Sequence, residues 1–521
     1  MSKIHIEGYK KFTILMVAIV LISSVFSLIS PILINYWSNI GQEITNEEIL
    51  ILLGVMILAT GTKIVLTYFR EKFAKEFNKK NFKNYLNQYY KLDYDYITEQ
   101  GPMTLMERMI IGVNSIYQYL TGDAIQIYSN ILILLGILTI VFLQNKVIFL
   151  ILFLLIPLHY FGYKHLNKEL SERSKELQEI SSTRWRDILS ILNQTDYIKQ
   201  LGDYQHINKI IDLNLEEIYK AQSKVNVYAQ SSSALISGIS NVAQTMIMVL
   251  TILRGLESNN YMSILLISVL IPLFNQSLQG ITNSNLNRRD FDISNSFFST
   301  WNSHLETEGS VNLKEINSLE INLDEIRIGD HHKKMNINER YLPGDFIWVK
   351  GDSGTGKSTL LKLIPRFRTV DGILINGRKI NEYTLDSLRN RIEYLSQNVP
   401  IIKGTLRDNL FLDIPYSSKI EEEMKKDPLL ASIFKNKTMD SIITEGAGNL
   451  SGGEKQKIAV ARILYKDVDL LLLDEITSGI DEETAKEIYD RIFEKMKNKI
   501  VFVISHNDLP SKYTNKIIEI K

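Results

Sequence analysis

The stretch Gly351-Asp352-Ser353-Gly354-Thr355-Gly356-Lys357-Ser358 follows the apolar run Phe346–Lys350 and precedes a helical pattern that begins at Thr359. Glycines at these spacings let successive backbone N–H groups point inward and surround a phosphate, and the dipole of the following helix favours the same anion. Lys357 supplies a point charge for the β- and γ-phosphates, and the Ser358 hydroxyl is a ligand for Mg²⁺. The strand–loop–helix context therefore predicts a nucleotide-binding loop of the P-loop type at Gly351–Thr359.

Length and composition restrict the class of protein. The chain has 521 residues, its 59 Lys and Arg equal its 59 Asp and Glu, and it contains no Cys. This length has room for about two to four domains. Because the charges balance, nothing draws the whole chain to nucleic acid, and we expect no nucleic-acid partner. The lack of Cys excludes disulfides, thiol catalysis and cysteine-bound zinc.

The first half of the chain carries long apolar runs. No charged residue occurs from Phe12 to Gly41, which exceeds the roughly 20 apolar residues that a bilayer core requires. A cleaved secretory signal would be shorter, so we predict a retained membrane helix. Further runs lie at about 49–69, 123–144, 147–166, 232–253 and 261–282. The alternative, buried helices of a large soluble protein, is disfavoured by the length and number of these runs.

Basic residues give the orientation of the membrane helices. Lysines precede the first run and follow the second, whereas the connector at 38–48 has acids and no Lys or Arg. This distribution predicts a multi-pass protein of the cell membrane with both termini in the cytoplasm. The inner connectors, roughly 70–122 and 167–231, have a helical pattern and extend the helices into the cytoplasm. Their tips, at Tyr94–Met103 and Leu201–His206, are where a membrane domain can contact a soluble one.

The remainder divides into a linker and an α/β domain. Residues 286–318 lose the apolar character, and short β-like runs alternate with helical stretches from about 319 onward. We therefore predict a six-helix membrane domain at 1–290, a linker at 291–318 and an α/β nucleotide-binding domain at 319–521. The richness in Lys, Ile and Asn suggests a bacterial source.

Two further motifs follow the phosphate loop. Asp469–Glu475 has the pattern of a buried strand that ends in two acids. Asp474 is placed to hold Mg²⁺, and Glu475 is placed to activate water as a general base. The acid-rich start of a helix would give the same sequence pattern and is the alternative. Leu450-Ser451-Gly452-Gly453-Glu454 precedes the helical pattern Lys455–Tyr465. Its bare N–H groups and its serine hydroxyl predict an anion site that lacks a lysine of its own.

These motifs carry a family resemblance. Gly351–Ser358, Gln397, Leu450–Glu454, Asp474-Glu475 and His506 stand in an order and spacing that resemble the nucleotide-binding domain of ABC transporters. The six spans with long extensions resemble the membrane domain of ABC exporters, so the resemblance covers nearly the whole chain. It implies an exporter half-transporter: an all-α polytopic membrane domain fused to an α/β P-loop NTPase domain with a helical subdomain, using ATP and Mg²⁺.

The resemblance also implies roles for single residues. Ser451, Gly452 and Gly453 would contact the γ-phosphate of an ATP held by the phosphate loop of a second half-transporter. Gln397 would reach the metal and the attacking water, and His506 would contact the γ-phosphate. All these residues are of hydrolysis-competent types, which favours a homodimer and leaves a heterodimer open. The family's adenine-stacking aromatic is absent from 326–332, and His331, His332 or another residue would take its place.

The substrate is indicated only weakly. Uncharged polar side chains recur on spans 5 and 6: Gln230, Ser231, Ser232, Ser233, Ser237, Ser240, Asn241, Gln244, Asn275, Gln276 and Gln279. They predict either a hydrated path for a peptide-like or amphipathic substrate or hydrogen bonds between helices. We expect ATP-driven export by alternating access, with membrane lipid around the helices. A signalling or antimicrobial peptide is the first expected substrate, and export of drugs or lipids is the alternative. A membrane-anchored ATPase that gates or senses is a hypothesis of another class.

Overall fold

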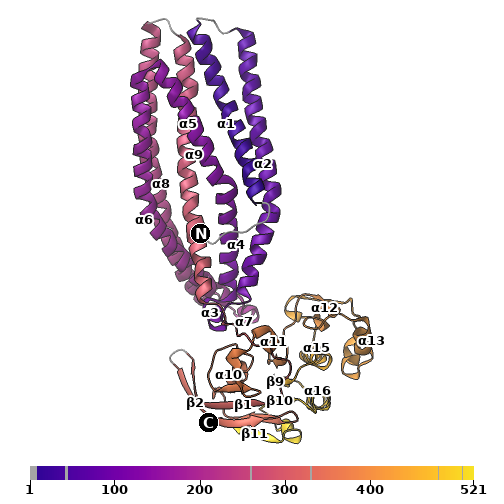
Figure 1. Ribbon diagram of the computed structural model, residues 1–521. Helices are drawn as coiled ribbons and strands as arrows, with labels where there is room; N and C mark the ends of the chain where they lie inside the picture. Colours follow the sequence, from indigo (N-terminus) through magenta and orange to yellow (C-terminus); the bar gives the residue numbers. More distant parts are fainter. Residues whose placement is uncertain are drawn as a thin grey trace. The chain divides into compact units, whose positions relative to one another are not determined.

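The computed structural model describes residues 9–40, 45–257, 261–328, 331–478, 480–506 and 508–520. It divides into two compact units (Figure 1). Unit 1 comprises Met1–Leu92 and Tyr96–Leu305, and unit 2 comprises Asp93–Asp95 and Glu306–Lys521.

Unit 1 is all-α, and long helices run side by side in it (Figure 1). The described residues contain six helices that are long and apolar enough to span a membrane, which confirms the predicted six-span membrane domain. Together with shorter segments, the α-helices up to Thr300 are α1 Tyr9–Asn39, α2 Asn46–Tyr89, α3 Tyr94–Gln100, α4 Pro102–Gln118, α5 Ala124–Gln144, α6 Lys146–Leu192, α7 Thr195–Gln200, α8 Gln205–Glu257 and α9 Tyr261–Thr300. A π-helical turn, Tyr119–Asp123, joins α4 to α5, and these three form one span.

The helices are much longer than a bilayer is thick. α6 has 47 residues, which corresponds to about 70 Å, against about 30 Å of hydrocarbon. α9 likewise continues to Thr300, so residues 291–300, which composition places in the linker, form its last turns. The physical reason is burial, because Phe291, Phe298 and Trp301 pack in an aromatic cluster with Phe77.

Close helix contacts in unit 1 depend on glycine. A Cβ added at Gly112 of α4 would stand 2.4 Å from the Phe298 ring of α9, and one at Gly136 of α5 would stand 2.6 Å from Leu28 of α1. Such small residues let membrane helices approach closely.

Unit 2 is built on two sheets. The antiparallel sheet has the order β2-β1-β4-β5 and the parallel sheet the order β11-β3-β10-β9-β6. The antiparallel strands are β1 Leu319–Ile328, β2 His331–Tyr341, β4 Ile373–Ile375 and β5 Arg378–Lys379. The parallel strands are β3 Phe346–Lys350, β6 Ile392–Leu395, β9 Leu470–Asp474, β10 Ile500–Ile504 and β11 Lys516–Glu519. Every residue of β9 and β10 is buried, as expected of a parallel sheet covered on both faces.

Helices surround the parallel sheet and form a separate helical part. The helices around the sheet are α10 Lys357–Leu363, α11 Leu385–Arg389, α15 Gly452–Tyr465 and α16 Glu482–Lys495. The helical part contains α12 Leu406–Leu410, α13 Ser418–Lys426 and α14 Ala431–Phe434, beside the short strands β7 Gly404–Thr405 and β8 Ile442–Ile443. α12, α13, α14 and α15 share one hydrophobic core. The predicted α/β domain with a helical subdomain is thus confirmed.

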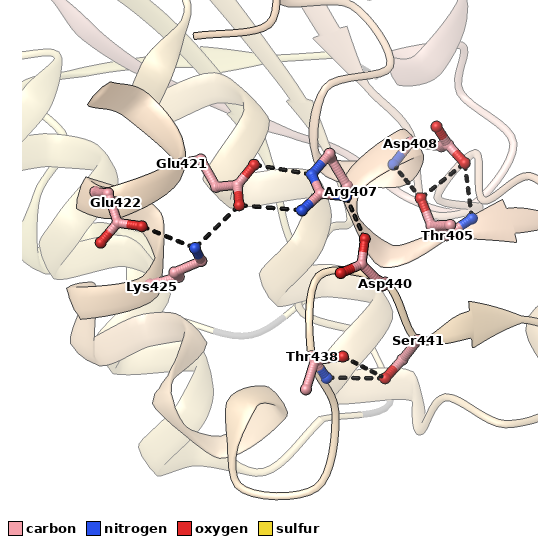
Figure 2. A network of polar contacts seen from close by, with 9 residues as sticks. All are labelled: Thr405, Arg407, Asp408, Glu421, Glu422, Lys425, Thr438, Asp440 and Ser441. Carbon is pink, nitrogen blue, oxygen red and sulfur yellow. Dashed lines mark hydrogen bonds and ion pairs between the residues drawn. The ribbon is translucent and has the colours of Figure 1, made fainter. Parts of the chain in front are cut away.

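A polar network joins the elements of the helical subdomain (Figure 2). Arg407 of α12 donates to both carboxylate oxygens of Glu421 on α13, through Nε at 2.8 Å and Nη2 at 3.2 Å, and it also pairs with Asp440. Lys425 lies 3.0 Å from the same Glu421 carboxylate. Hydrogen bonds from Arg407 and Lys425 lower the pKa of Glu421 to about 2. The network therefore holds α12 against α13 at neutral pH.

Candidate functional site

Four of the sequence motifs meet at one edge of the parallel sheet. β3, β10, β9 and β6 are neighbours and run parallel, so their carboxyl ends lie at the same edge, where ligands bind in open α/β sheets. The phosphate loop follows β3, His506 follows β10, Asp474 ends β9 and Gln397 follows β6.

The phosphate loop has the backbone that its glycines predict. Gly356 caps α10 with φ +105°, and a Cβ there would stand 2.8 Å from Met335 Cε. A Cβ at Gly351 would stand 2.3 Å from the Ile520 carbonyl oxygen. Lys357 is buried, and its Nζ donates to the carbonyls of Gly351 and Asp352, each at 2.8 Å. A cation and exposed backbone N–H groups at a helix N-terminus suit a phosphate chain.

Asp474 receives two hydroxyl donors. Ser358 Oγ donates to Asp474 Oδ1 at 3.0 Å, and the Tyr394 hydroxyl donates to Asp474 Oδ2 at 2.8 Å. Burial and the adjacent Asp474 charge raise the pKa of Tyr394, so this phenol stays a donor. The Ser358 hydroxyl and the Asp474 carboxylate are oxygen ligands of the type that Mg²⁺ prefers, so these residues fit the predicted metal.

Glu475 follows the strand in a strained conformation. Its φ is +54°, in the left-handed region that residues other than glycine rarely adopt. Its N–H donates to the Ile504 carbonyl at 3.1 Å, and its Oε1 lies 2.9 Å from His506 Nε2. Strain of this kind persists where the surroundings impose it, and it is concentrated at functional sites. The carboxylate and the imidazole are therefore held as a pair at the sheet edge.

Gln397 contacts the segment after Glu475. Its Nε2 donates to Ser478 Oγ at 3.3 Å, and its backbone carbonyl accepts from Gln456 Nε2 at 3.4 Å. Ser478 begins the loop Ser478–Asp481, of which Gly479 lies outside the described residues. Asp481 ends this loop by capping α16 with a hydrogen bond from the Thr484 N–H at 2.8 Å.

The segment Leu450–Glu454, which we call the signature segment, lies on a different element. Ser451 caps α15: its Oγ accepts from the Glu454 N–H at 3.2 Å, and its own N–H donates to the Glu454 carboxylate at 2.7 Å. Burial acts to raise the pKa of Glu454, but the hydrogen bond from Ser451 and the pairing with Lys437 outweigh it and lower the pKa. Among the described residues, no hydrogen bond joins Leu450–Gly453 to the phosphate loop of the same chain.

The β1–β2 hairpin supplies a residue that sequence reasoning missed. Lys333 of β2 donates its Nζ to the Gly354 carbonyl in the phosphate loop. Of the two histidines predicted to replace the stacking aromatic, the His331 side chain lies outside the described residues. His332 is 54% exposed, with Nδ1 3.9 Å from Glu325 Oε2.

Some polar side chains of spans 5 and 6 join helices, and others line a cavity. Asn275 Nδ2 donates to Gln244 Oε1 at 2.6 Å, and Ser240 pairs with His159 Nε2, so these residues join helices. Gln276 and Gln279 instead line a cavity of about 440 Å³ between α1, α2, α5 and α9.

Comparisons with known proteins agree with this architecture. Residues 13–278 match the family model of the ABC transporter transmembrane region, and residues 335–478 match the ABC transporter model. The chain is similar to the ATP-dependent lipid A-core flippase of Shigella flexneri, with 25% identity over 498 residues that cover 92% of this chain and 84% of the relative. It is similarly related to the flippase of the same name in Aliivibrio fischeri, with 24% identity over 498 residues and the same shares of both chains.

A solved structure has the same fold. The structure of a bacterial Atm1-family ABC exporter with ATP bound matches with a TM-score of 0.82 and 17% identity, over 98% of this chain and 93% of that one. The transmembrane family model alone covers more than half of the present chain. The chain therefore belongs to the ABC transporters, as a half-transporter of the cell membrane that binds and hydrolyses ATP.

Proposed function

We propose that this chain forms one half of a dimer that moves a lipid-like amphiphile from the inner leaflet outward, by alternating access driven by ATP. The observation that carries the proposal is similarity over nearly the whole chain to relatives named as lipid A-core flippases. This reading replaces the peptide that we expected first, because the flippase relatives favour the lipid alternative.

The sheet edge supplies the hydrolytic residues. Lys357 and the loop N–H groups hold the phosphates. Ser358 and Asp474 would hold Mg²⁺, which would neutralise charge on the phosphates. Glu475 accepts a proton from the attacking water, and His506, 2.9 Å away, orients that carboxylate and contacts the γ-phosphate. Gln397 reaches the same site from the end of β6.

The signature segment explains why two chains are needed. Ser451, Gly452 and Gly453 stand at the N-terminus of α15, away from the phosphate loop of their own chain. We propose that they complete the ATP site of the partner subunit, so that ATP closes the dimer and hydrolysis reopens it. A homodimer is the simplest assembly, because one chain contains every residue type that hydrolysis needs.

Lipid translocation is the experiment that tests this function. The purified chain is reconstituted into vesicles that carry a fluorescent phospholipid, and the labelled lipid accessible to an impermeant quencher is measured with ATP and Mg²⁺. We expect ATP-dependent movement by the wild type and none by Glu475→Gln. Movement of a labelled peptide without lipid movement would restore the peptide reading. Hydrolysis without movement of either would favour a gate or sensor.

A further inference from the structure

Two adjoining cavities lie between α4, α5, α6 and α9 of unit 1, with volumes of about 680 Å³ and 300 Å³. Both are lined by Lys164, Asn167, Arg289 and Asp292, and we call the combined space the interface slot. Along α6 its lining extends from Ile156 to Glu179, a length of about 35 Å at about 1.5 Å per residue. A space of this length suits an amphiphile with a chain and a headgroup better than a small ion.

One end of the slot is apolar. Its apolar side chains, Leu134, Ile156, Leu278 and Ile281, lie within the predicted membrane spans. Tyr160 and Tyr163 follow on α6, and their amphipathic rings suit the level where hydrocarbon gives way to headgroups. This end therefore fits an acyl chain.

The other end carries an excess of positive charge. Six cationic and three acidic side chains line the slot: Arg108, Lys164, Lys168, Lys175, Arg288 and Arg289, with Glu172, Glu179 and Asp292.

Much of this charge is balanced locally. Arg288 pairs with Asp292 at 3.7 Å. Lys168 and Lys175 stand three to four residues from Glu172 or Glu179 on α6, the spacing at which opposite charges offset each other. Arg289 pairs with Asp290 at 2.9 Å, so Arg108 and Lys164 remain. Within the described residues, no carboxylate lies within 4.0 Å of Arg108 or Lys164, and Arg108 lies over the Phe297 ring at 4.8 Å.

Three buried polar atoms of the slot have no hydrogen-bond partner among the described residues: Arg289 Nη1, Asn167 Oδ1 and His159 Nδ1. Arg289 uses Nε and Nη2 on Asp290, at 3.0 and 2.9 Å, which leaves Nη1. His159 is 4% exposed, lines the apolar end and uses Nε2 on Ser240. Buried polar groups normally have partners, so a ligand that offers an anionic oxygen and a hydroxyl would be favoured here.

We propose that the interface slot binds an amphiphile whose headgroup combines a phosphate-type anion with hydroxyl groups. The anion lies against Lys164 and Arg289, the hydroxyls reach Asn167, and the chain follows the apolar end past His159. This inference rests on the proposed export of an amphiphile and specifies its headgroup.

The experiment compares phosphatidylglycerol, which has a phosphate and two free hydroxyls, with zwitterionic phosphatidylcholine. Radiolabelled lipid retained by the detergent-solubilised chain is measured for wild type, Arg289→Gln, Lys164→Gln and Lys75→Gln. Lys75 is an exposed lysine of α2 outside the slot, so its variant controls for the lost charge. We expect wild type and Lys75→Gln to prefer phosphatidylglycerol. We expect either slot variant to lose that preference by about tenfold, as for one charge-assisted hydrogen bond.

Each outcome decides the proposal. Equal retention of the two lipids, or a preference that survives both slot variants with unchanged Tm, would overturn it. Competition by glycerol 3-phosphate as strong as by the lipid would assign the site to a free anion, and displacement by an acidic peptide would assign it to a peptide. The export proposal and the slot proposal can fail separately. If Glu475→Gln retains the lipid but the wild type shows no ATP-dependent lipid movement, export is refuted and the slot assignment stands.

Discussion

Replacing Glu475 by glutamine removes the proton-accepting oxygen and keeps the size of the side chain. The amide oxygen can still accept from His506 Nε2, which lies 2.9 Å from Glu475 Oε1, so the local geometry is retained. A positioned general base contributes about 10²- to 10⁴-fold to the rate, or about 3–5 kcal/mol of barrier. We expect ATP turnover to fall by this factor, while ATP affinity changes by less than about threefold because the base acts on the transition state.

The assay is phosphate release in lipid nanodiscs, with ATP affinity from titration of a fluorescent nucleotide. Glu494→Gln is the matched control, because Glu494 is exposed on α16 and makes the same change of charge away from the sheet edge. Turnover by Glu475→Gln within about threefold of wild type would refute the base assignment, since that loss is below the range for a general base. An equal loss in the control would trace the effect to net charge.

The strained backbone of Glu475 allows a second test at this position, which compares thermal stability with turnover. The φ of +54° at Glu475 costs a residue with a Cβ about 1 kcal/mol, whereas glycine loses about 0.5–1 kcal/mol through its freer unfolded chain. These effects nearly cancel, so Glu475→Gly is expected to keep Tm within about 4 °C while losing turnover like Glu475→Gln. A much lower Tm would show that the carboxylate holds the fold.

Three further changes test other parts of the chain. Lys357→Ala removes the buried cation of the phosphate loop and is expected to weaken ATP binding by about tenfold or more; unchanged affinity in a nucleotide titration would contradict its role. Gly112→Ala places a Cβ 2.4 Å from an aromatic ring of α9 and is expected to destabilise by about 1–3 kcal/mol, seen as a lower Tm than for Gly54→Ala, where nothing lies within 4 Å. Glu421→Gln removes a carboxylate whose pKa is lowered to about 2 by Arg407. A lowered pKa stabilises the fold above the ordinary value near 4.5 and ceases to do so as the pH falls towards 2, so the Tm deficit of this variant should be full at pH 7 and shrink towards pH 3; a constant deficit would exclude the charge as its cause.

The sequence predicted the membrane helices because a long uncharged run has few stable alternatives in a bilayer. It did not predict where α9 ends. Residues 286–300 are mostly polar, so composition alone places a linker there. The helical spacing of Phe291, Phe298 and Trp301, all buried, carries the missed signal: seven and then three residues apart, they fall on one helical face.

The same limit applies to the candidate site. The phosphate loop and the acids at the end of β9 are local motifs, and they could be identified from residues that are adjacent in the sequence. Tyr394 and Lys333 could not, because each contacts its partner only through strand order. β6 lies beside β9, which brings the Tyr394 hydroxyl to Asp474, and β2 passes the loop that Lys333 contacts.

The signature serine has a structural explanation that does not compete with phosphate binding. A hydroxyl has one proton to donate and two lone pairs to accept with, and the cap uses a lone pair of Ser451 Oγ for the Glu454 N–H. The proton stays available to an anion, and Gly453 has no atom closer to its Cβ position than 3.9 Å. The nearby Glu454 carboxylate would repel a phosphate, but Lys437 lies 3.2 Å from it and offsets that charge. The segment can therefore cap its own helix and still accept the γ-phosphate of a nucleotide held by a second chain, as the dimer proposal requires.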